Sequence, residues 1–385
     1  MISAEKRNAL LKVLAQKGEF EFTTDSLGSE EARMLFEGPR GVFEGYSREL
    51  AAAESRAEPI PFLYLSRSTL NARALRCDGH DFIGINWGTI VLLQDLFFRM
   101  MATPHVFSEI GDPDAELDFS TLPALPLDAA LLPTAGGAPF EFPVTPQHPA
   151  RAMYAIFLAQ VTFDFIFIHE HQHIVGGHLA FLEQGRQGMA AIEQEPGVAD
   201  LMTSHVLELE ADAAAANFSL NIACDRQGNK WRIPEVLAPY LTTEKSRYRA
   251  WLFAVHTLFL IMEDASNRAF LAGRPGRTTH PVAVFKRGTM ANLVFGRRGP
   301  FKKLEKAIPV GFEMLIGAHE ALASVVDGRE KFMIGVDLFG PGQDDGHRLL
   351  VRRWREMRPR LQELASANGA QSAPADLIAT FSTGW

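Results

Sequence analysis

The sequence predicts a mainly helical α+β fold organised around one active-site helix. Residues 163–182, FDFIFIHEHQHIVGGHLAFL, are apolar at first and then rich in histidine, which is typical of a core helix that carries functional groups. Residues 198–224 contain neither Gly nor Pro and predict a second long helix. Residues 60–86 hold apolar runs separated by a turn, so we expect a small sheet with a β-hairpin.

The first of these helices contains His169, Glu170 and His173 in the spacing HExxH. Residues four apart lie on one face of a helix, so both imidazoles can reach a single metal ion while Glu170 lies beside it. A Zn²⁺ ion held there needs a third protein ligand and an open position for water, which is the arrangement of a hydrolytic site. The alternative is a buried helix whose histidines bind backbone carbonyl groups.

Two further histidines in this stretch are not predicted to be ligands. His171 is two residues from each proposed ligand and therefore points to the other side of the helix. His178 follows His173 by five positions, whereas the extended metzincin pattern HExxHxxGxxH requires six, where this chain has Leu179. The third ligand is therefore expected downstream.

The second helix carries the pattern ExxAD, formed by Glu208, Ala211 and Asp212. Glu208 and Asp212 are four residues apart and share a face of the helix, while Glu210 points elsewhere. One carboxylate can bind the metal, and the other can accept a hydrogen bond from the outer nitrogen of a ligand histidine. The alternative is an ordinary solvated acidic face.

With HExxH followed by ExxAD, the chain resembles the gluzincin metallopeptidases, in particular the HtpX and CaaX-protease family and the Lit-type phage-exclusion peptidases. The resemblance implies a zincin-like core in which one Zn²⁺ ion is bound by His169, His173 and Glu208. It implies that Glu170 is the general base and that Asp212 orients a ligand histidine. It also implies a role in bacterial stress or phage defence through cleavage of a protein.

A segment ahead of the active helix extends the resemblance. Residues 71–86 resemble the hairpin of these enzymes, with an NAxA pattern, a turn and an apolar strand. In the family the edge strand of this hairpin pairs with the extended substrate, a form of β-augmentation. By resemblance, the substrate-binding edge here consists of Asn71, Ala72, Arg73 and Ala74. The pattern HExxHxxxGH is closer to the Lit-type group than to the multi-pass membrane members.

A candidate for stabilising the oxyanion lies further downstream. His280 and Pro281 precede Arg287, and related peptidases often carry HP followed by Arg near the metal, although here the Arg is one position further along. A His donor near zinc would stabilise the oxyanion of a tetrahedral intermediate. We predict His280 for this role, with His256 as the second candidate and a plain loop or core histidine as the alternative.

The chain divides into three predicted regions. Residues 1–59 are expected to form a helical cap, with helices over residues 3–17, 29–36 and 46–57. Residues 60–290 form the catalytic domain, and residues 291–385 form a C-terminal helical region. The catalytic domain includes a long loop at residues 103–149, which holds nine of the 22 prolines and is either a cover for the cleft or a passive surface segment.

Composition limits the classes of function. The chain has 385 residues, of which 47% are hydrophobic and 22% charged, as in ordinary soluble globular proteins. A net charge of −8 does not favour nucleic acid as a partner, and two cysteines provide no disulfide framework. The N-terminus lacks the features of a signal peptide and the apolar runs are short or interrupted, so we expect a cytoplasmic protein without a membrane span.

These observations predict a zinc metalloendopeptidase that acts on a protein or peptide substrate. Two other classes stay open at this point. One is an inactive or regulatory zinc protein that binds peptides without cleaving them, and the other is a metal-free helical interaction protein. The sequence indicates neither the substrate nor the oligomeric state.

Overall fold

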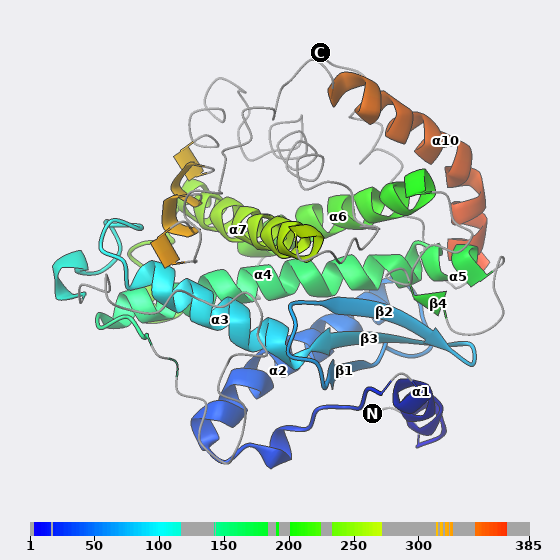
Figure 1. The fold of residues 1–385 in the computed structure, drawn as a ribbon, viewed down its shortest axis with the longest axis horizontal. Helices are drawn as coiled ribbons and strands as arrows, with labels where there is room; N and C mark the ends of the chain where they lie inside the picture. Colours follow the sequence, from blue (N-terminus) through cyan, green and yellow to red (C-terminus); the bar gives the residue numbers. More distant parts are fainter. Residues whose placement is uncertain are drawn as a thin grey trace.

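The computed structural model describes residues 4–16, 18–116, 142, 144–183, 190–191, 201–224, 233–271 and 343–367, and part of 313–325. This part of the chain is mainly helical with one small sheet (Figure 1), which confirms the predicted α+β class. The helices are α1 (Ala4–Gln16), α2 (Glu30–Ala53), α3 (Trp87–Met101), α4 (Pro149–Val175), α5 (His178–Glu183), α6 (Leu201–Ala223), α7 (Glu244–Leu271) and α10 (Gln343–Ala367). The boundary at residue 290 lies outside the described residues.

The sheet contains four strands in the order β1-β3-β2-β4. They are β1 (Phe62–Leu65), β2 (Ala72–Cys77), β3 (His80–Asn86) and β4 (Ala190–Ala191). β2 and β3 form the predicted hairpin, and β1 pairs with β3 in parallel. Asp78 and Gly79 form the turn and both have positive φ, 48° and 76°, which is the backbone twist that a two-residue hairpin turn requires.

The two faces of the sheet bury different parts of the core. Ala72, Ala74 and Ile83 alternate along their strands with Leu75 and Phe82, because successive side chains of a strand point to opposite faces. The first set belongs to the main core beneath α4, whereas the second set packs against α1 (Figure 1). The sheet is therefore covered on both sides, and α4 lies on the face that carries the two alanines.

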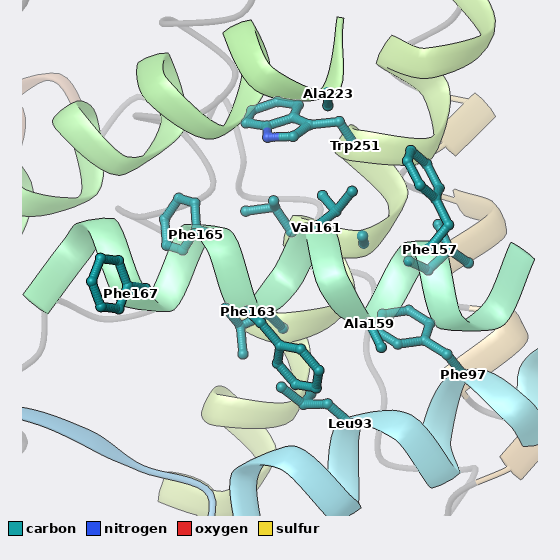
Figure 2. Packing of buried hydrophobic residues seen from close by; sticks show 14 of the residues in the cluster. Leu93, Phe97, Phe157, Ala159, Val161, Phe163, Phe165, Phe167, Ala223 and Trp251 are labelled. Carbon is teal, nitrogen blue, oxygen red and sulfur yellow. The ribbon is translucent and has the colours of Figure 1, made fainter. Parts of the chain in front are cut away.

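Helix α4 is the centre of the main core. It is apolar around nearly its whole circumference, which is the pattern of a fully buried helix. Figure 2 shows Phe163 directed toward Leu93 of α3, while Val161 lies on the side of Trp251 of α7. Packing on both sides fixes the direction in which the end of α4 presents its polar residues.

One prediction for the N-terminal region was wrong. Residues 29–36 and 46–57 were expected to form two helices, but α2 is one continuous helix from Glu30 to Ala53 that passes through Pro39. Ser29 caps its first turn by accepting a hydrogen bond from the backbone N–H of Ala32. Phe36 and Phe43, on either side of the proline, are completely buried, and this packing offsets the backbone hydrogen bond that Pro39 cannot donate.

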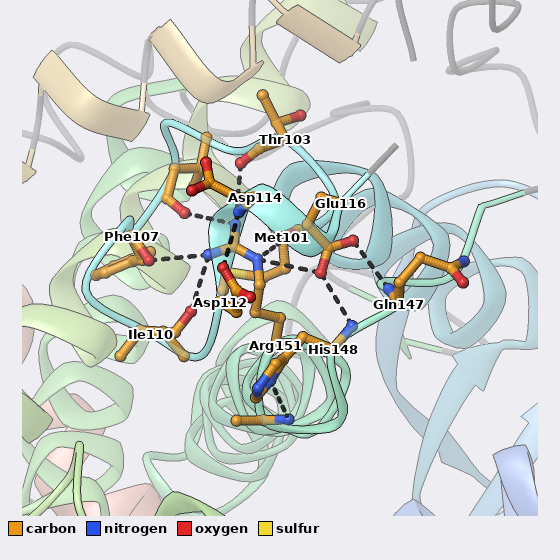
Figure 3. A network of polar contacts seen from close by, with 12 residues as sticks. Met101, Thr103, Phe107, Ile110, Asp112, Asp114, Glu116, Gln147, His148 and Arg151 are labelled. Carbon is orange, nitrogen blue, oxygen red and sulfur yellow. Dashed lines mark hydrogen bonds and ion pairs between the residues drawn. The ribbon is translucent and has the colours of Figure 1, made fainter. Parts of the chain in front are cut away.

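The start of α4 is held by a buried arginine (Figure 3). Arg151 is 0% exposed, and each of its five N–H donors reaches one backbone carbonyl oxygen at 2.7–3.1 Å. These oxygens belong to Met101, Thr103, Val106, Phe107 and Ile110. The guanidinium group is therefore fully satisfied, and it ties the chain that follows α3 to the first turn of α4.

Glu116 completes this cluster and closes the base of the proline-rich segment. Its carboxylate lies 3.4 Å from Nε of Arg151 and accepts hydrogen bonds from the backbone N–H groups of Gln147 and His148, at 2.8 and 3.1 Å. Residues 117–141, the larger part of the predicted loop at 103–149, lie outside the described residues. Glu116, which precedes this segment, and Gln147 and His148, which follow it, are nevertheless in direct contact.

Candidate metal centre

The last turns of α4 bring the two histidines of HExxH together. His169 and His173 lie one turn apart, and their Nε2 atoms are 2.9 Å from each other. Both residues are buried, with exposed fractions of 7% and 1%. The helix geometry expected from the spacing is thus confirmed, and both rings turn the same nitrogen toward a common point.

The third group comes from α6, as the ExxAD pattern predicted. Glu208 is completely buried, with Oε2 3.5 Å from Nε2 of His169 and Oε1 3.5 Å from Nε2 of His173. Ligand atoms around a tetrahedral Zn²⁺ ion lie roughly 3.4 Å apart, given metal–ligand distances of about 2.1 Å. The separations of 2.9, 3.5 and 3.5 Å are close to this value, so the donor set fits one such ion.

Asp212 lies behind the first histidine. Its Oδ1 atom is 2.8 Å from Nδ1 of His169, on the opposite side of the ring from Glu208. Burial disfavours the imidazolium form of His169, but Asp212 and Glu208 outweigh this effect and raise its pKa to about 10. The two carboxylates therefore favour a positive charge next to His169. A divalent cation would compete with the proton for the ring nitrogen.

His178 lies behind the second histidine. Its Nδ1 atom is 2.8 Å from Nδ1 of His173, and the two rings meet edge to face at 68°. His178 is thus not a third member of the ligand set, as the sequence predicted, but it contacts a ligand from the rear. The spacing of the histidines does not predict this contact. A local signal for it is the glycine pair at 176–177, which turns the chain back after α4.

Glu170 is placed beside a cavity rather than within the cluster. It is 7% exposed and lines a small hollow that opens to solvent. His169 and Asp212 line the same space, and apolar walls come from Phe165 of α4 and Phe259 of α7. A mainly apolar hollow with a few convergent polar groups is the usual form of a ligand site.

The predicted substrate edge borders the same cavity. Asn71 and Ala72 line it, whereas the side chain of Arg73 points to the other face of the sheet, where it forms an ion pair with Glu19. Ala74 is buried in the main core. Asn71 and Ala72 therefore face the site, whereas Ala74 faces the main core and Arg73, one position away on the strand, faces the opposite side of the sheet.

One side of β2 at its first residues faces away from β3. The N–H of Asn86 donates to the carbonyl of Asn71 at 3.0 Å, so Ala72 and Ala74 direct their backbone groups away from β3 in an antiparallel ladder. On the edge away from β3, β4 pairs with Leu75 and Arg76, and among the described residues no strand lies against Ala72 and Ala74 on that side. The N–H of Ala72 donates instead to Oδ1 of the Asn71 side chain, at 3.0 Å.

The remaining histidines are placed away from the cluster or are not described. His171 lies on the other side of α4, 3.7 Å from Glu54, and burial lowers its pKa to about 3. His256 is buried in α7 and is not among the described residues that line the cavity. His280, Pro281 and Arg287 lie outside the described residues, so the role of His280 stays a prediction.

Comparisons with known proteins add no relative to this picture. No protein-family model matches the chain, and neither the curated proteins nor the solved structures gave a match. Helix α4 is long and apolar enough to cross a membrane, but 78% of its most apolar window is buried inside the protein. The core helix of a globular protein has the same properties.

Proposed function

We propose that this protein is a zinc metalloendopeptidase with a zincin-like core of the gluzincin type. The observation that carries the proposal is the convergence of His169, His173 and Glu208, three buried donors from two helices, at the separations of a tetrahedral site. Two imidazoles and one carboxylate are a common ligand set of hydrolytic zinc, whereas structural zinc sites usually have four protein ligands and are rich in cysteine.

The three residues would hold one Zn²⁺ ion through Nε2 of each ring and the carboxylate of Glu208. When bound, the ion supplies a water of lowered pKa and polarises the carbonyl group of the scissile bond. Glu170 accepts the proton of the attacking water and passes it to the leaving amine. Asp212 holds the ring of His169 by accepting its Nδ1 proton, which leaves Nε2 free to bind the metal.

The substrate in this proposal is an extended peptide. On the edge of β2 away from β3, the backbone groups of Ala74 and the carbonyl of Ala72 would pair with a peptide strand, and the Ala72 N–H would do so in exchange for its bond to Asn71. The cavity lies between that edge and Glu170. Leu258, Phe259 and Met262 of α7 contribute to its apolar wall. A peptide that carries a large apolar side chain next to the scissile bond therefore suits the site best.

The proposal is tested by metal analysis combined with cleavage of a peptide library. The purified chain should hold one Zn²⁺ ion, and Glu170→Gln should keep the metal but lose about 100- to 10,000-fold in turnover, because it cannot accept the proton. Glu356→Gln, the same substitution at an exposed position of α10, is the matched control and should cleave normally.

Two results would contradict the proposal. Wild-type protein without zinc would support the metal-free interaction protein, and normal hydrolysis by Glu170→Gln would exclude the assigned mechanism. A zinc-loaded wild-type protein that binds library peptides but cleaves none would support the regulatory, non-cleaving alternative.

A further inference from the structure

The second ligand histidine is connected to the C-terminal helix through three side chains. His178 lies against Nδ1 of His173, at 2.8 Å, and the Nε2 atom of His178 lies 3.8 Å from Oε2 of Glu210. The same oxygen of Glu210 accepts a hydrogen bond from the indole N–H of Trp354 in α10, at 3.1 Å. The contacts thus run from a metal-facing ring to a helix about 180 residues further along the sequence.

The side chains that form these contacts are shielded from water. The side chain of His178 is completely buried, Trp354 is 4% exposed, and the side chain of Glu210 is 14% exposed. Water can therefore do little to replace a partner that is removed. The Nε2 atom of His178 is buried and has no hydrogen-bond partner within range, so Glu210 is the acceptor that its N–H faces.

Metal binding fixes the proton positions along this chain of contacts. A ring that binds a metal through Nε2 carries its proton on Nδ1, so His173 must donate to His178. His178 must then accept through Nδ1 and carry its own proton on Nε2, which is the atom that faces Glu210. The carboxylate of Glu210 favours this tautomer, and the Trp354 hydrogen bond holds the carboxylate in place.

The packing of α10 supports the same arrangement. Trp354, Met357 and Leu361 form a small core with Val206 and Leu209 of α6. Gly177, which turns the chain between α4 and His178, has a φ of +77° and lies directly against α10. A side chain at this position would meet the backbone of Leu361 and Ala365 at 3.0–3.1 Å. The C-terminal helix is therefore fitted closely to the turn that positions His178.

We propose that His178 is a positioning residue for the metal ligand His173, and that α10 sets its orientation through Trp354 and Glu210. The inference rests on the proposed metal site but assigns a new role to three residues outside it. It makes the C-terminal helix part of the metal centre, since its removal or displacement would loosen the support of His173.

The test measures Zn²⁺ affinity in the full-length chain by competition with a chromophoric chelator, together with the visible spectrum of the Co²⁺-loaded protein. His178→Phe removes the acceptor and should lower Zn²⁺ affinity about 10- to 100-fold. His178→Asn places a side-chain oxygen near the position of Nδ1 and should restore most of that loss. Because the Co²⁺ spectrum reports ligand geometry, it should change in His178→Phe and return toward wild type in His178→Asn.

A matched pair of tryptophan variants tests the contribution of α10. Trp354→Phe keeps an aromatic ring but removes the N–H donor, and it should lower Zn²⁺ affinity by a smaller factor than His178→Phe. Trp251→Phe removes an equivalent buried indole hydrogen bond, to Ser219 at 2.9 Å, away from the metal. It should leave Zn²⁺ affinity and the Co²⁺ spectrum unchanged even if it lowers the stability of the apo-protein equally.

The outcomes separate this inference from the proposed function. If the wild-type chain binds no zinc, the proposed function fails and this inference fails with it. If the wild type binds zinc and His178→Phe binds it equally well, or His178→Asn is as weak as His178→Phe, the positioning role of His178 is wrong and the proposed function stands. If His178→Phe does not fold, the other two variants decide. A large loss of Zn²⁺ affinity in His178→Asn excludes the positioning role of His178, and unchanged affinity and spectrum in Trp354→Phe exclude the role of α10.

Discussion

The two ends of α4 each bury a polar cluster, and the clusters differ in what completes them. At the start of the helix, the five N–H donors of Arg151 are all matched by carbonyl oxygens, with Glu116 beside them. Near the end, the ring nitrogens of His169 and His173 and the carboxylate of Glu208 face one another. The first cluster contains its own cation, the guanidinium group of Arg151, and stabilises the fold. The second cluster consists of nitrogen and oxygen donors that suit a metal cation bound from solution.

The largest effect is expected from breaking the closed cluster. Arg151→Met keeps much of the side-chain volume but removes the guanidinium bonds to five carbonyl groups and the ion pair with Glu116. We expect the free energy of unfolding to fall by about 3–5 kcal/mol, the range for removing one partner of a buried ion pair. Urea unfolding in the presence of a chelator measures this. A loss below about 1 kcal/mol, the size of a single ordinary hydrogen bond, would show that the cluster is not the anchor described here.

The open cluster should respond to metal instead. Zn²⁺ at about 1,000 times its dissociation constant should stabilise the folded chain by about 4 kcal/mol, because the ion binds the folded state. Glu208→Gln should lose most of this gain, while Arg151→Met should keep it despite its lower starting stability. Thermal unfolding with and without Zn²⁺ gives both values. Equal gains in Glu208→Gln and the wild type would place the bound ion elsewhere.

Between the two ends of α4, Asp164 shows a third way to bury a polar group. Burial raises its pKa to about 7, although hydrogen bonds from Gln160 and Tyr46 act in the other direction. The folded state therefore keeps a proton that the unfolded chain releases near pH 4, so this contribution to stability is present at low pH and is lost as the pH rises through about 7.

The corresponding experiment is a pH series of unfolding measurements. Between about pH 4 and about pH 7, the Asp164 proton should make the free energy of unfolding fall by up to roughly 1.4 kcal/mol per pH unit. Asp164→Asn cannot titrate and should remove that part of the slope. Glu54, whose pKa is also raised to about 7 by burial, stays in both proteins, so the difference between the curves isolates Asp164. Parallel curves would contradict the assignment.

The sequence predicted those parts of the site that depend on local geometry. The spacing of His169 and His173, and that of Glu208 and Asp212, determines which side chains share a helix face, and the structure places all four as expected. The turn at Asp78 and Gly79 could be predicted for the same reason, because its residue types meet a local backbone requirement.

The contacts that sequence patterns missed are those made between distant segments. Arg151 binds backbone carbonyl groups, which every residue possesses, so its partners leave no signal in the sequence. His178 and Glu210 were set aside because neither has the spacing of a ligand, yet tertiary packing brings both behind His173. The continuous helix through Pro39 likewise depends on buried aromatic neighbours rather than on local propensity.

Glu116 accepts hydrogen bonds from the backbone N–H groups of Gln147 and His148, so it joins the two ends of the proline-rich stretch. The chain before and after the proline-rich stretch is therefore held together at the start of α4. Because the entropy of closing a loop grows only slowly with its length, doubling the length of the stretch between these two anchors would cost roughly 0.6 kcal/mol in closure entropy. Extra length between the two anchors would thus be absorbed before the chain reaches the turns of α4 that carry His169 and His173.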